Sequence, residues 1–241
     1  DPDKGIDYNY VYVLRRLCTA RPLMKIISFG DVHMVTAQME KLAGELATAD
    51  MLILSGDLTN WGGKTDARHV IHAAQVYCSS VLALPGNLDQ PEVVDFLQMT
   101  RVSLHGESRR YGDLVCYGCG GSNLTPFHTP LEYTDETLWQ LLQQASADVA
   151  PDTLQIMVCH TPPYATKVDR LLDGRPVGSP AVRQFIAEKQ PHLCLTGHIH
   201  ESPGVDIIGR TKILNAGPFS EGGYIVVHYE NGILDAELRF V

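Results

Sequence analysis

The sequence predicts an α/β fold in which two β-sheets pack face to face and helices cover their outer surfaces. Two observations lead to this prediction. Over most of the chain, short apolar segments alternate with amphipathic ones, a pattern typical of parallel β-α units. From about residue 200 onward, short apolar segments are separated by tight turns, which is typical of antiparallel strands. Two mixed sheets flanked by helices accommodate both patterns.

The first half of the chain supplies alternating strands and helices. Continuous apolar runs predict strands at residues 24–29, 51–54 and 81–84. Apolar residues at helical spacing predict helices at 37–48, at 66–77 and after Pro91, because proline favours the first turn of a helix. Two short strands are then expected near 101–104 and 114–117, followed by a long loop at 118–133.

The second half begins with further α/β elements and ends in hairpins. Helices are expected from Thr134 to about Ala147 and over 180–188, and strands at 154–158 and 193–195. The segments 207–208 and 212–214 flank a turn at Gly209 and Arg210. Strands at 224–229 and 233–240 flank Asn231-Gly232, a dipeptide that strongly favours a hairpin turn.

Length and composition indicate an ordinary globular protein. The 241 residues can form a single domain over 24–241, and residues 1–23 are expected to be an N-terminal extension, either extraneous or carrying an extra strand at 8–13. No apolar stretch approaches the ~20 residues that a membrane helix needs, and the N-terminus has no secretory pattern. The net charge of −9 argues against a nonspecific nucleic-acid binder. Six cysteines, mostly in apolar segments, favour a reduced cytoplasmic protein.

Seven residues with metal-ligand chemistry each follow a predicted strand. They are Asp31, His33, Asp57, Asn87, His160, His198 and His200. Polar residues just past the carboxyl ends of strands in α/β sheets converge in one crevice. Imidazoles, carboxylates and one amide together suit transition metals better than calcium, which prefers oxygen ligands alone. The pattern therefore predicts a two-metal hydrolase site.

Each of these residues also has a structural interpretation. Asp31 and Asp57 could cap helices that follow their strands, and Asn87 and His160 could occupy turns beside Gly86 and Pro162. His198 and His200 are harder to explain in this way. Each structural interpretation explains a single residue well. Together they explain the set poorly, because all seven residues would have to follow strand ends by accident.

The motifs resemble those of the calcineurin-like metallophosphoesterase superfamily. Its five blocks correspond here to Gly30-Asp31-Val32-His33, Gly56-Asp57-Leu58-Thr59-Asn60, Gly86-Asn87-Leu88-Asp89, His160 and Gly197-His198-Ile199-His200. The match covers residues 24–217, and the loop at 122–127 and Leu88 resemble the small prokaryotic branch. The resemblance implies a four-layer sandwich, with two mixed β-sheets between helices and a dinuclear metal site at one end.

The resemblance also implies a role for each ligand. Asp31, His33 and His200 would bind the first metal, Asn87, His160 and His198 the second, and Asp57 would bridge both. Manganese, iron or zinc would suit these ligands. A metal-bridging hydroxide would attack phosphorus in line, and Asp57, Asn87 and His198 would hold the hydroxide and position the phosphate.

One residue departs from the family pattern. Many members carry a histidine directly after the asparagine, where it is thought to protonate the leaving oxygen while the following acid orients it. This chain has Leu88 there, although Asp89 remains. Leucine cannot donate a proton, which puts fast cleavage of poor leaving groups in doubt.

Other polar residues are weaker candidates. His128 and Asn123 lie in the loop 118–133 and could contact substrate, and His128 could replace the missing acid, although an exposed loop histidine is at least as good an interpretation. Arg109 and Arg110, and His69 and His72, are expected to be solvated. The lone pair Cys116 and Cys119 favours packing over zinc or redox chemistry.

The sequence therefore predicts a metal-dependent phosphodiesterase or phosphatase acting on a small phosphoester. The alternative is a non-catalytic scaffold of the same fold that binds partner proteins. A scaffold has no need to retain seven ligands, and none is missing here. The physiological substrate, the monoester or diester preference and the oligomeric state do not follow from the sequence.

Overall fold

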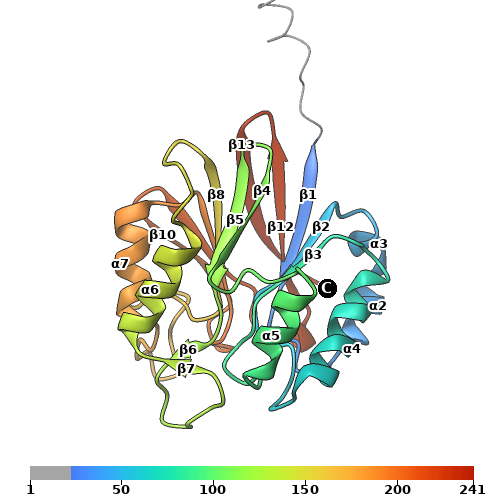
Figure 1. The fold of residues 1–241 in the computed structure, drawn as a ribbon, viewed down its shortest axis with the longest axis horizontal. Helices are drawn as coiled ribbons and strands as arrows, with labels where there is room; N and C mark the ends of the chain where they lie inside the picture. Colours follow the sequence, from blue (N-terminus) through green and yellow to red (C-terminus); the bar gives the residue numbers. More distant parts are fainter. Residues whose placement is uncertain (1–22) are drawn as a thin grey trace, which may run out of the picture.

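The computed structural model describes residues 23–241, which form four layers (Figure 1). Two β-sheets lie face to face in the middle, and helices cover the outer face of each sheet. The α/β sandwich expected from the sequence is therefore confirmed. Residues 1–22 of the expected N-terminal extension lie outside the described residues. No helix within 23–241 is both long and apolar enough to cross a membrane.

The first sheet has the strand order β13-β12-β1-β2-β3. Its three parallel strands are those predicted in the first half of the chain: β1 (Met24–Phe29), β2 (Met51–Leu54) and β3 (Val81–Ala83). The C-terminal hairpin of β12 (Gly223–Glu230) and β13 (Ile233–Phe240) joins it antiparallel to β1. Asn231 and Gly232 have φ of 50° and 83°, as the expected two-residue turn requires.

The second sheet has the order β10-β11-β9-β8-β5-β4. Its parallel centre consists of β11 (Thr211–Asn215), β9 (Leu193–Thr196), β8 (Leu154–Cys159) and β5 (Leu114–Cys119). The outer strands β10 (Gly204–Ile208) and β4 (Glu107–Tyr111) are antiparallel to their neighbours. Two mixed sheets are therefore present: parallel strands form the centre of the second sheet, and in the first sheet they extend from β1 to the edge strand β3.

Alternate residues of the central strands enter different cores. Ile26 faces the interface between the sheets, whereas Ile27 packs under the helices of the first sheet. In β8, Ile156 faces the same interface and Met157 packs under the helices of the second sheet. Both faces of each sheet are thus covered, which explains why these strands are continuously apolar in sequence.

Four longer helices cover the outer faces of the sheets. They are α4 (Lys64–Gln75) and α5 (Glu92–Met99) over the first sheet, and α6 (Asp135–Ala145) and α7 (Pro180–Lys189) over the second. The Thr134 side chain caps α6 by accepting from the backbone N–H of Thr137, and Ser179 caps α7 in the same way. The sequence locates all four helices to within two or three residues.

Three expectations are corrected. The predicted helix 37–48 is two short helices, α2 (Gln38–Lys41) and α3 (Ala43–Leu46), because Leu42 leaves helical geometry (φ −96°, ψ 5°) and Gly44 weakens the helix. Residues 101–104 form a single bridge to Ala83 instead of a strand. The strand β4 was missed because its edge position leaves no apolar pattern, and the loop 118–133 contains two-residue strands β6 (Ser122–Asn123) and β7 (Glu132–Tyr133).

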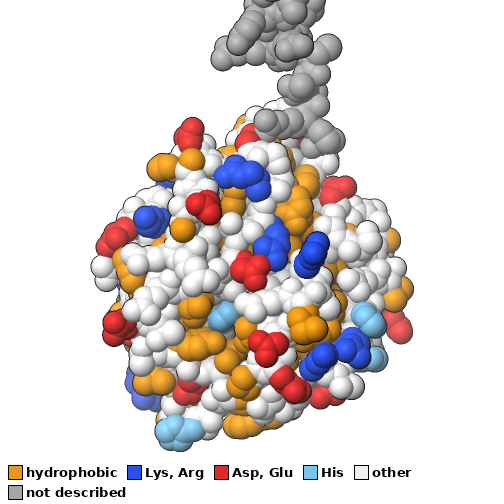
Figure 2. Space-filling view, viewed as in Figure 1, with side chains coloured by type: hydrophobic (Ala, Val, Ile, Leu, Met, Phe, Trp, Pro, Cys, Tyr) orange, Lys and Arg blue, Asp and Glu red, His pale blue; other side chains and the backbone are white. Residues whose placement is uncertain are grey.

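The charged side chains are dispersed over the surface. On the face drawn in Figure 2, basic side chains lie scattered among acidic ones and form no continuous basic patch. His69 and His72 on α4 are exposed, as expected, and Arg109 pairs with Glu107 at 2.6 Å on β4.

Candidate metal centre

The seven predicted ligand residues meet where strands of both sheets end. Asp31 and His33 follow β1, Asp57 follows β2, Asn87 follows β3, His160 follows β8, and His198 and His200 follow β9. Each of the seven contacts at least one other across the cluster. The first sheet thus provides four of the side chains and the second sheet provides three, so the cluster exists only when the sheets are packed together.

Four of these residues have a left-handed backbone. Asp31, His33, Asp57 and His198 have φ of 50°, 46°, 46° and 68°. This conformation is uncommon outside glycine and costs about 1–3 kcal/mol, and it concentrates at functional sites. The backbone N–H of Asp31 donates to Gly56 O at 2.9 Å, and that of His33 donates to Asp57 O at 3.0 Å. These bonds hold the two strained loops against each other.

The positions of the helices exclude the helix-cap interpretation of Asp31 and Asp57. Helix α2 begins at Gln38 and α4 at Lys64, so neither Asp31 nor Asp57 caps a helix. The Asp31 carboxylate instead accepts from the backbone N–H of His198 at 3.1 Å. The carboxylate of Asp57 accepts from the backbone N–H of Leu88 at 2.8 Å. Both side chains are therefore directed across the crevice.

Two glycines of the motifs leave space for these carboxylates. A Cβ atom on Gly86 would lie 2.0 Å from Oδ1 of Asp57, and one on Gly197 would lie 2.4 Å from Oδ2 of Asp31. Real Cβ atoms do not approach other atoms so closely, so a larger residue at either position would displace a carboxylate. Each glycine therefore makes room for a ligand that comes from a different motif.

The first group of donors consists of Asp31, His33 and His200, whose ligand atoms lie within 4.8 Å of one another. Nε2 of His33 is 3.2 Å from Nε2 of His200, which is 3.3 Å from Oδ1 of Asp31. Nδ1 of His33 lies 3.3 Å from the carbonyl oxygen of Thr59, an acceptor, so the proton belongs on Nδ1. The Nε2 lone pair of His33 then faces the centre of the group.

The second group surrounds His160, which is fully buried. Its Nδ1 donates to Ser55 O at 2.9 Å, and its Nε2 faces Oδ1 of Asn87 at 3.1 Å and Oδ1 of Asp57 at 3.5 Å. The His198 ring lies alongside, with its centroid 5.2 Å from that of His160. Asp31 also comes within 4.8 Å of this group, although the sequence motifs associate it with the first group.

Burial and charge act in opposition on these side chains. Burial alone would lower the pKa of His160, but the carboxylates of Asp57 and Asp31 raise it to about 9. Burial and the neighbouring His160 lower the pKa of His198 to about 4. Burial would raise the pKa of Asp57, yet His160, His33 and the Leu88 N–H together lower it. The cluster thus keeps a buried carboxylate ionised by surrounding it with groups that carry or accept positive charge.

A second layer of hydrogen bonds orients Asn87. Its amide Nδ2 donates to Oγ1 of Thr129 at 3.0 Å, which turns its Oδ1 toward His160. The Thr129 hydroxyl in turn donates to Oε1 of Glu132 at 2.6 Å. Glu132 also accepts from the backbone N–H of Thr129 and from the N–H and hydroxyl of Thr125. These bonds outweigh the effect of burial and lower the pKa of Glu132 to about 2.

Sequence reasoning did not identify Thr129 or Glu132. The only available signal was the length of the loop 118–133, because neither residue belongs to a motif. The same loop contains His128, which has φ of 51°, is exposed and is not among the residues that line the cavity described below. Asn123 bonds to Val177 O and Thr161 Oγ1 and so connects two loops.

The position of Leu88 differs from expectation in one respect. Its side chain lines the cavity, as a replacement for a catalytic histidine would. Asp89, however, does not face the cavity as an orienting acid. It is fully buried and accepts from the N–H of Leu58, Thr59 and Gly86 and from the Thr59 hydroxyl. Burial and the charge of Asp57 raise its pKa, and its role is to tie the loops after β2 and β3 together.

The cysteine pair has a packing role. Cys116 enters the core between the sheets, whereas Cys119 enters the core under α6 and α7. Their side chains leave opposite faces of β5 and cannot bind one ion together. The packing interpretation of this pair is confirmed.

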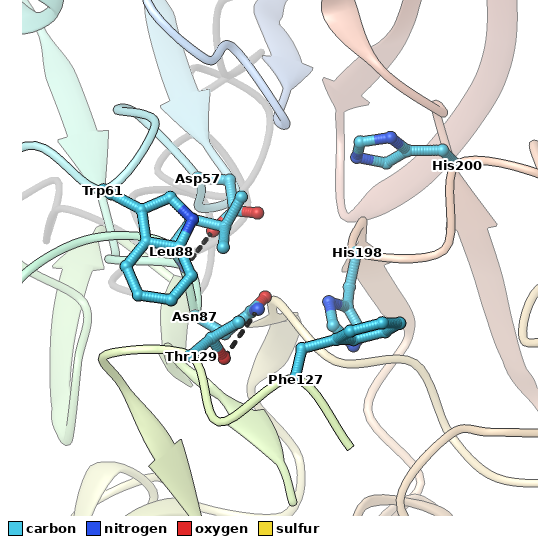
Figure 3. A pocket seen from close by; sticks show the side chains of 8 residues that line it. All are labelled: Asp57, Trp61, Asn87, Leu88, Phe127, Thr129, His198 and His200. Atoms are coloured by element: carbon cyan, nitrogen blue, oxygen red, sulfur yellow. Dashed lines mark hydrogen bonds between the residues drawn. The ribbon is translucent and has the colours of Figure 1, made fainter. Parts of the chain in front are cut away.

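A cavity of about 320 Å³ opens beside the cluster (Figure 3). Its lining residues come from the ligand loops and from the loop 118–133, and they are Asp57, Trp61, Asn87, Leu88, Phe127, Thr129, His198 and His200. Four predicted ligands therefore face a space that can admit a small molecule. This is the concave, mixed polar and apolar setting expected of a ligand site.

Comparison with known proteins identifies the family. The calcineurin-like phosphoesterase family model matches residues 24–202. The chain belongs to the calcineurin-like phosphoesterase family. It is also 34% identical over 203 residues to an uncharacterized protein of Methanocaldococcus jannaschii. The aligned region covers 82% of this chain and 89% of that protein.

Solved structures share the phosphoesterase fold. A protein of Thermus thermophilus superposes with a TM-score of 0.69 and 19% identity, covering 90% of this chain and 99% of that one. A purple acid phosphatase from seeds of yellow lupin (Lupinus luteus) superposes with a TM-score of 0.60 and 12% identity, covering 91% of this chain and 52% of that one. At these identities the likeness establishes the fold alone. Calcineurin-like phosphoesterases act on phosphoesters, and the clustered Asp and His side chains fit a dinuclear metal site.

Proposed function

We propose that this phosphoesterase is a dimetal-dependent hydrolase of phosphate monoesters or diesters. The observation that carries the proposal is the convergence of electron-pair donors around His160. Its Nε2 lies 3.1 Å from Oδ1 of Asn87 and 3.5 Å from Oδ1 of Asp57. With Nδ1 of His160 already donating to Ser55 O, such a group requires a cation at its centre, either a proton or a metal ion.

We propose the following distribution of ligands. Asp31, His33 and His200 hold one ion, as their mutual approach supports. Asn87, His160 and His198 hold the other, and Asp57 lies between His33 (4.0 Å) and His160 (3.5 Å), a position that suits a bridging carboxylate. Manganese, iron and zinc all suit mixed imidazole and carboxylate ligands. Residues 24–241 are proposed to form one domain, because β12 pairs with β1 and so completes the first sheet.

The chain itself orients the reacting groups. Bound metal ions would supply a hydroxide near neutral pH and positive charge for the phosphoryl oxygens. The Leu88 N–H fixes the Asp57 carboxylate, and the Thr129 hydroxyl fixes the amide of Asn87. The depressed pKa of His198 keeps its ring neutral and available as a ligand. In-line attack by water then needs no covalent enzyme intermediate, and Leu88 supplies no proton to the leaving oxygen.

A non-catalytic scaffold is less well supported. A scaffold would have no use for left-handed backbone at four ligand positions, or for the Thr129–Glu132 bonds that orient Asn87. The left-handed backbone costs stability, and both features are directed at the crevice, not at an outer surface.

A metal analysis combined with a phosphoester panel tests the proposal. Protein purified without added metal would be analysed for bound ions, then loaded with manganese, iron or zinc and assayed on monoesters and diesters. We expect two ions per chain at saturation and turnover of at least one ester class. In oxygen-18 water, a single turnover should place one solvent oxygen in the product. A chain that binds no metal, or that forms a phosphorylated intermediate, would contradict the proposal.

A further inference from the structure

Two aromatic side chains stand exposed at the mouth of the cavity. Trp61 and Phe127 lie on opposite sides of the opening in Figure 3, and they are 51% and 77% exposed. The side chain of Leu88 lies in the same lining. Exposed aromatic rings forgo the favourable free energy of burial, so a group of them at an opening indicates a contact surface.

The backbone fixes Trp61 relative to the ligand cluster. Its φ of 62° is left-handed, which is uncommon for a bulky residue. The Trp61 N–H donates to the carbonyl of Leu88 at 3.0 Å, and the Trp61 carbonyl accepts from Nε2 of Gln90 at 3.4 Å. Leu88 directly follows the proposed ligand Asn87. The indole is therefore attached to the same loop that would hold the phosphoryl group.

Phe127 is fixed by a different set of bonds. Its backbone N–H donates to Oγ1 of Thr125 at 3.1 Å, and Thr125 is bonded through its own N–H and hydroxyl to Glu132. Thr129, two residues further along, is bonded to the same carboxylate. The Phe127 ring is thus carried on a loop closed by a single acidic side chain.

The cavity lining determines which ligand chemistry these rings suit. Within the described residues, the lining contains no lysine or arginine. A phosphoryl group here would be held by the ligand cluster, whereas the organic group attached to it would meet Trp61, Phe127 and Leu88. Aromatic side chains bind planar rings through their faces and edges, with a preference over saturated groups of similar size.

We propose that Trp61 and Phe127 form a subsite for a planar aromatic ring on the organic group of the phosphoester. The inference rests on the proposed hydrolase function and narrows its substrate class. The subsite acts in binding and takes no part in proton transfer, so it discriminates between substrates by ring planarity and not by leaving-group acidity.

Titration calorimetry on the manganese-loaded full chain tests the subsite without requiring turnover. The ligands are benzylphosphonate and cyclohexylmethylphosphonate, which share charge and linker and differ in ring planarity. We expect the benzyl compound to bind about three- to tenfold more tightly. Trp61→Ala and Phe127→Ala should each reduce this preference, and Trp61→Phe should retain most of it.

Leu124→Ala is the matched control. Leu124 is 65% exposed in the loop of Phe127 but does not line the cavity, so its removal should leave the preference unchanged. Equal affinities for the two phosphonates, or a preference that survives both alanine substitutions, would overturn the subsite and leave the hydrolase standing. If neither phosphonate binds the metal-loaded chain, the subsite is overturned, and the metal analysis and the ester panel decide the hydrolase function separately.

Discussion

The two sides of the ligand cluster are built differently. Asp57, Asn87 and His160, the buried side, are at most 4% exposed, and each makes a hydrogen bond to the backbone or to Thr129. His33 and His200, the open side, have side chains that are 18% and 42% exposed. The comparison teaches that one cluster can combine side chains that belong to the folded core with side chains that solvent reaches.

The largest expected effect is at Asp57, where the two sides meet. Among residues 23–241, Asp57 has the only carboxylate paired within 4.0 Å of both His33 and His160. Asp57→Asn removes it, yet preserves the shape of the side chain. We expect loss of both ions and a fall in kcat/KM of at least about a thousandfold, roughly 4 kcal/mol. Metal content and kinetics on the purified variant measure this. Full metal occupancy with undiminished turnover would remove Asp57 from the bridging position.

The second prediction compares the two sides directly. His160→Ala should lower the free energy of unfolding of the metal-free protein by about 2–4 kcal/mol, because it leaves a cavity and the unpaired carbonyl of Ser55. His200→Ala should cost less than about 1 kcal/mol, because its side chain is partly exposed. Both variants should bind less metal. Urea unfolding in the presence of a chelator measures the difference, and equal losses would refute the distinction between the sides.

The third prediction concerns the orientation of Asn87. Thr129→Val keeps the shape of the side chain and removes the hydroxyl that links Asn87 to Glu132. Metal affinity or kcat should fall about 10- to 100-fold, as is usual when a partner of a metal ligand is lost. Thr129→Ser should keep most of the wild-type metal affinity and kcat, because serine retains the hydroxyl. A valine variant with normal affinity and rate would show that Asn87 needs no such support.

The fourth prediction tests Leu88 on the cavity wall. Without a proton donor there, rates should depend steeply on leaving-group pKa, so nitrophenyl esters should be cleaved far faster than alkyl esters. Leu88→His should raise alkyl-ester turnover by about tenfold, below the ~10²–10⁴ of a fully oriented acid. The gain is limited because Asp89 is engaged by four other donors and cannot orient the new ring.

The outcome that contradicts this account is a parent enzyme that cleaves both ester classes at similar chemical rates. Another group would then supply the proton. His128→Ala is the variant to examine in that case, and it should steepen the dependence on leaving-group pKa if His128 reaches the substrate.

The smallest expected effect is on the pH dependence of stability, and it comes from Glu132 in the loop that supports Asn87. The pKa of Glu132 is lowered to about 2 in the folded chain, below its value in the unfolded chain. Its contribution is therefore fully present above about pH 4.5 and is lost as pH falls through about 2. Metal-free wild type should exceed Glu132→Gln in stability by about 0.5–1 kcal/mol at pH 6, with the difference shrinking toward pH 2. A stability difference that stays the same from pH 6 to pH 2 would show that the pKa of Glu132 is not lowered by folding.

The sequence located most of the fold because the informative patterns are local. Continuous apolar runs marked the central strands, and Thr134 and Pro180 marked helix starts. The edge strand β4 escaped because its residues, Glu107–Tyr111, are only partly buried and show no apolar alternation. The single helix at 37–48 was wrong because the backbone leaves helical geometry at Leu42, although the apolar spacing continues through that residue.

The positions of the candidate ligands were also predictable, because a polar residue that follows glycine at a strand end is visible in sequence. Their supporting residues were not. Thr129 accepts from Asn87, which lies 42 positions away, and Glu132 acts through Thr129; no local pattern records such a contact. The engagement of Asp89 with four donors likewise depends on how the loops after β2 and β3 meet. The left-handed backbone at His33 and His198 has no signature in the residue types.

The division of the cluster between the sheets has a consequence for synthesis of the chain. Asp31, His33, Asp57 and Asn87 leave the ribosome well before His160, and His198 and His200 are the last of the seven to be made. A nascent chain that ends before residue 198 carries five of the seven side chains and lacks the two histidines that follow β9. The full cluster therefore forms only after the strands of the second sheet have been made and the two sheets have docked.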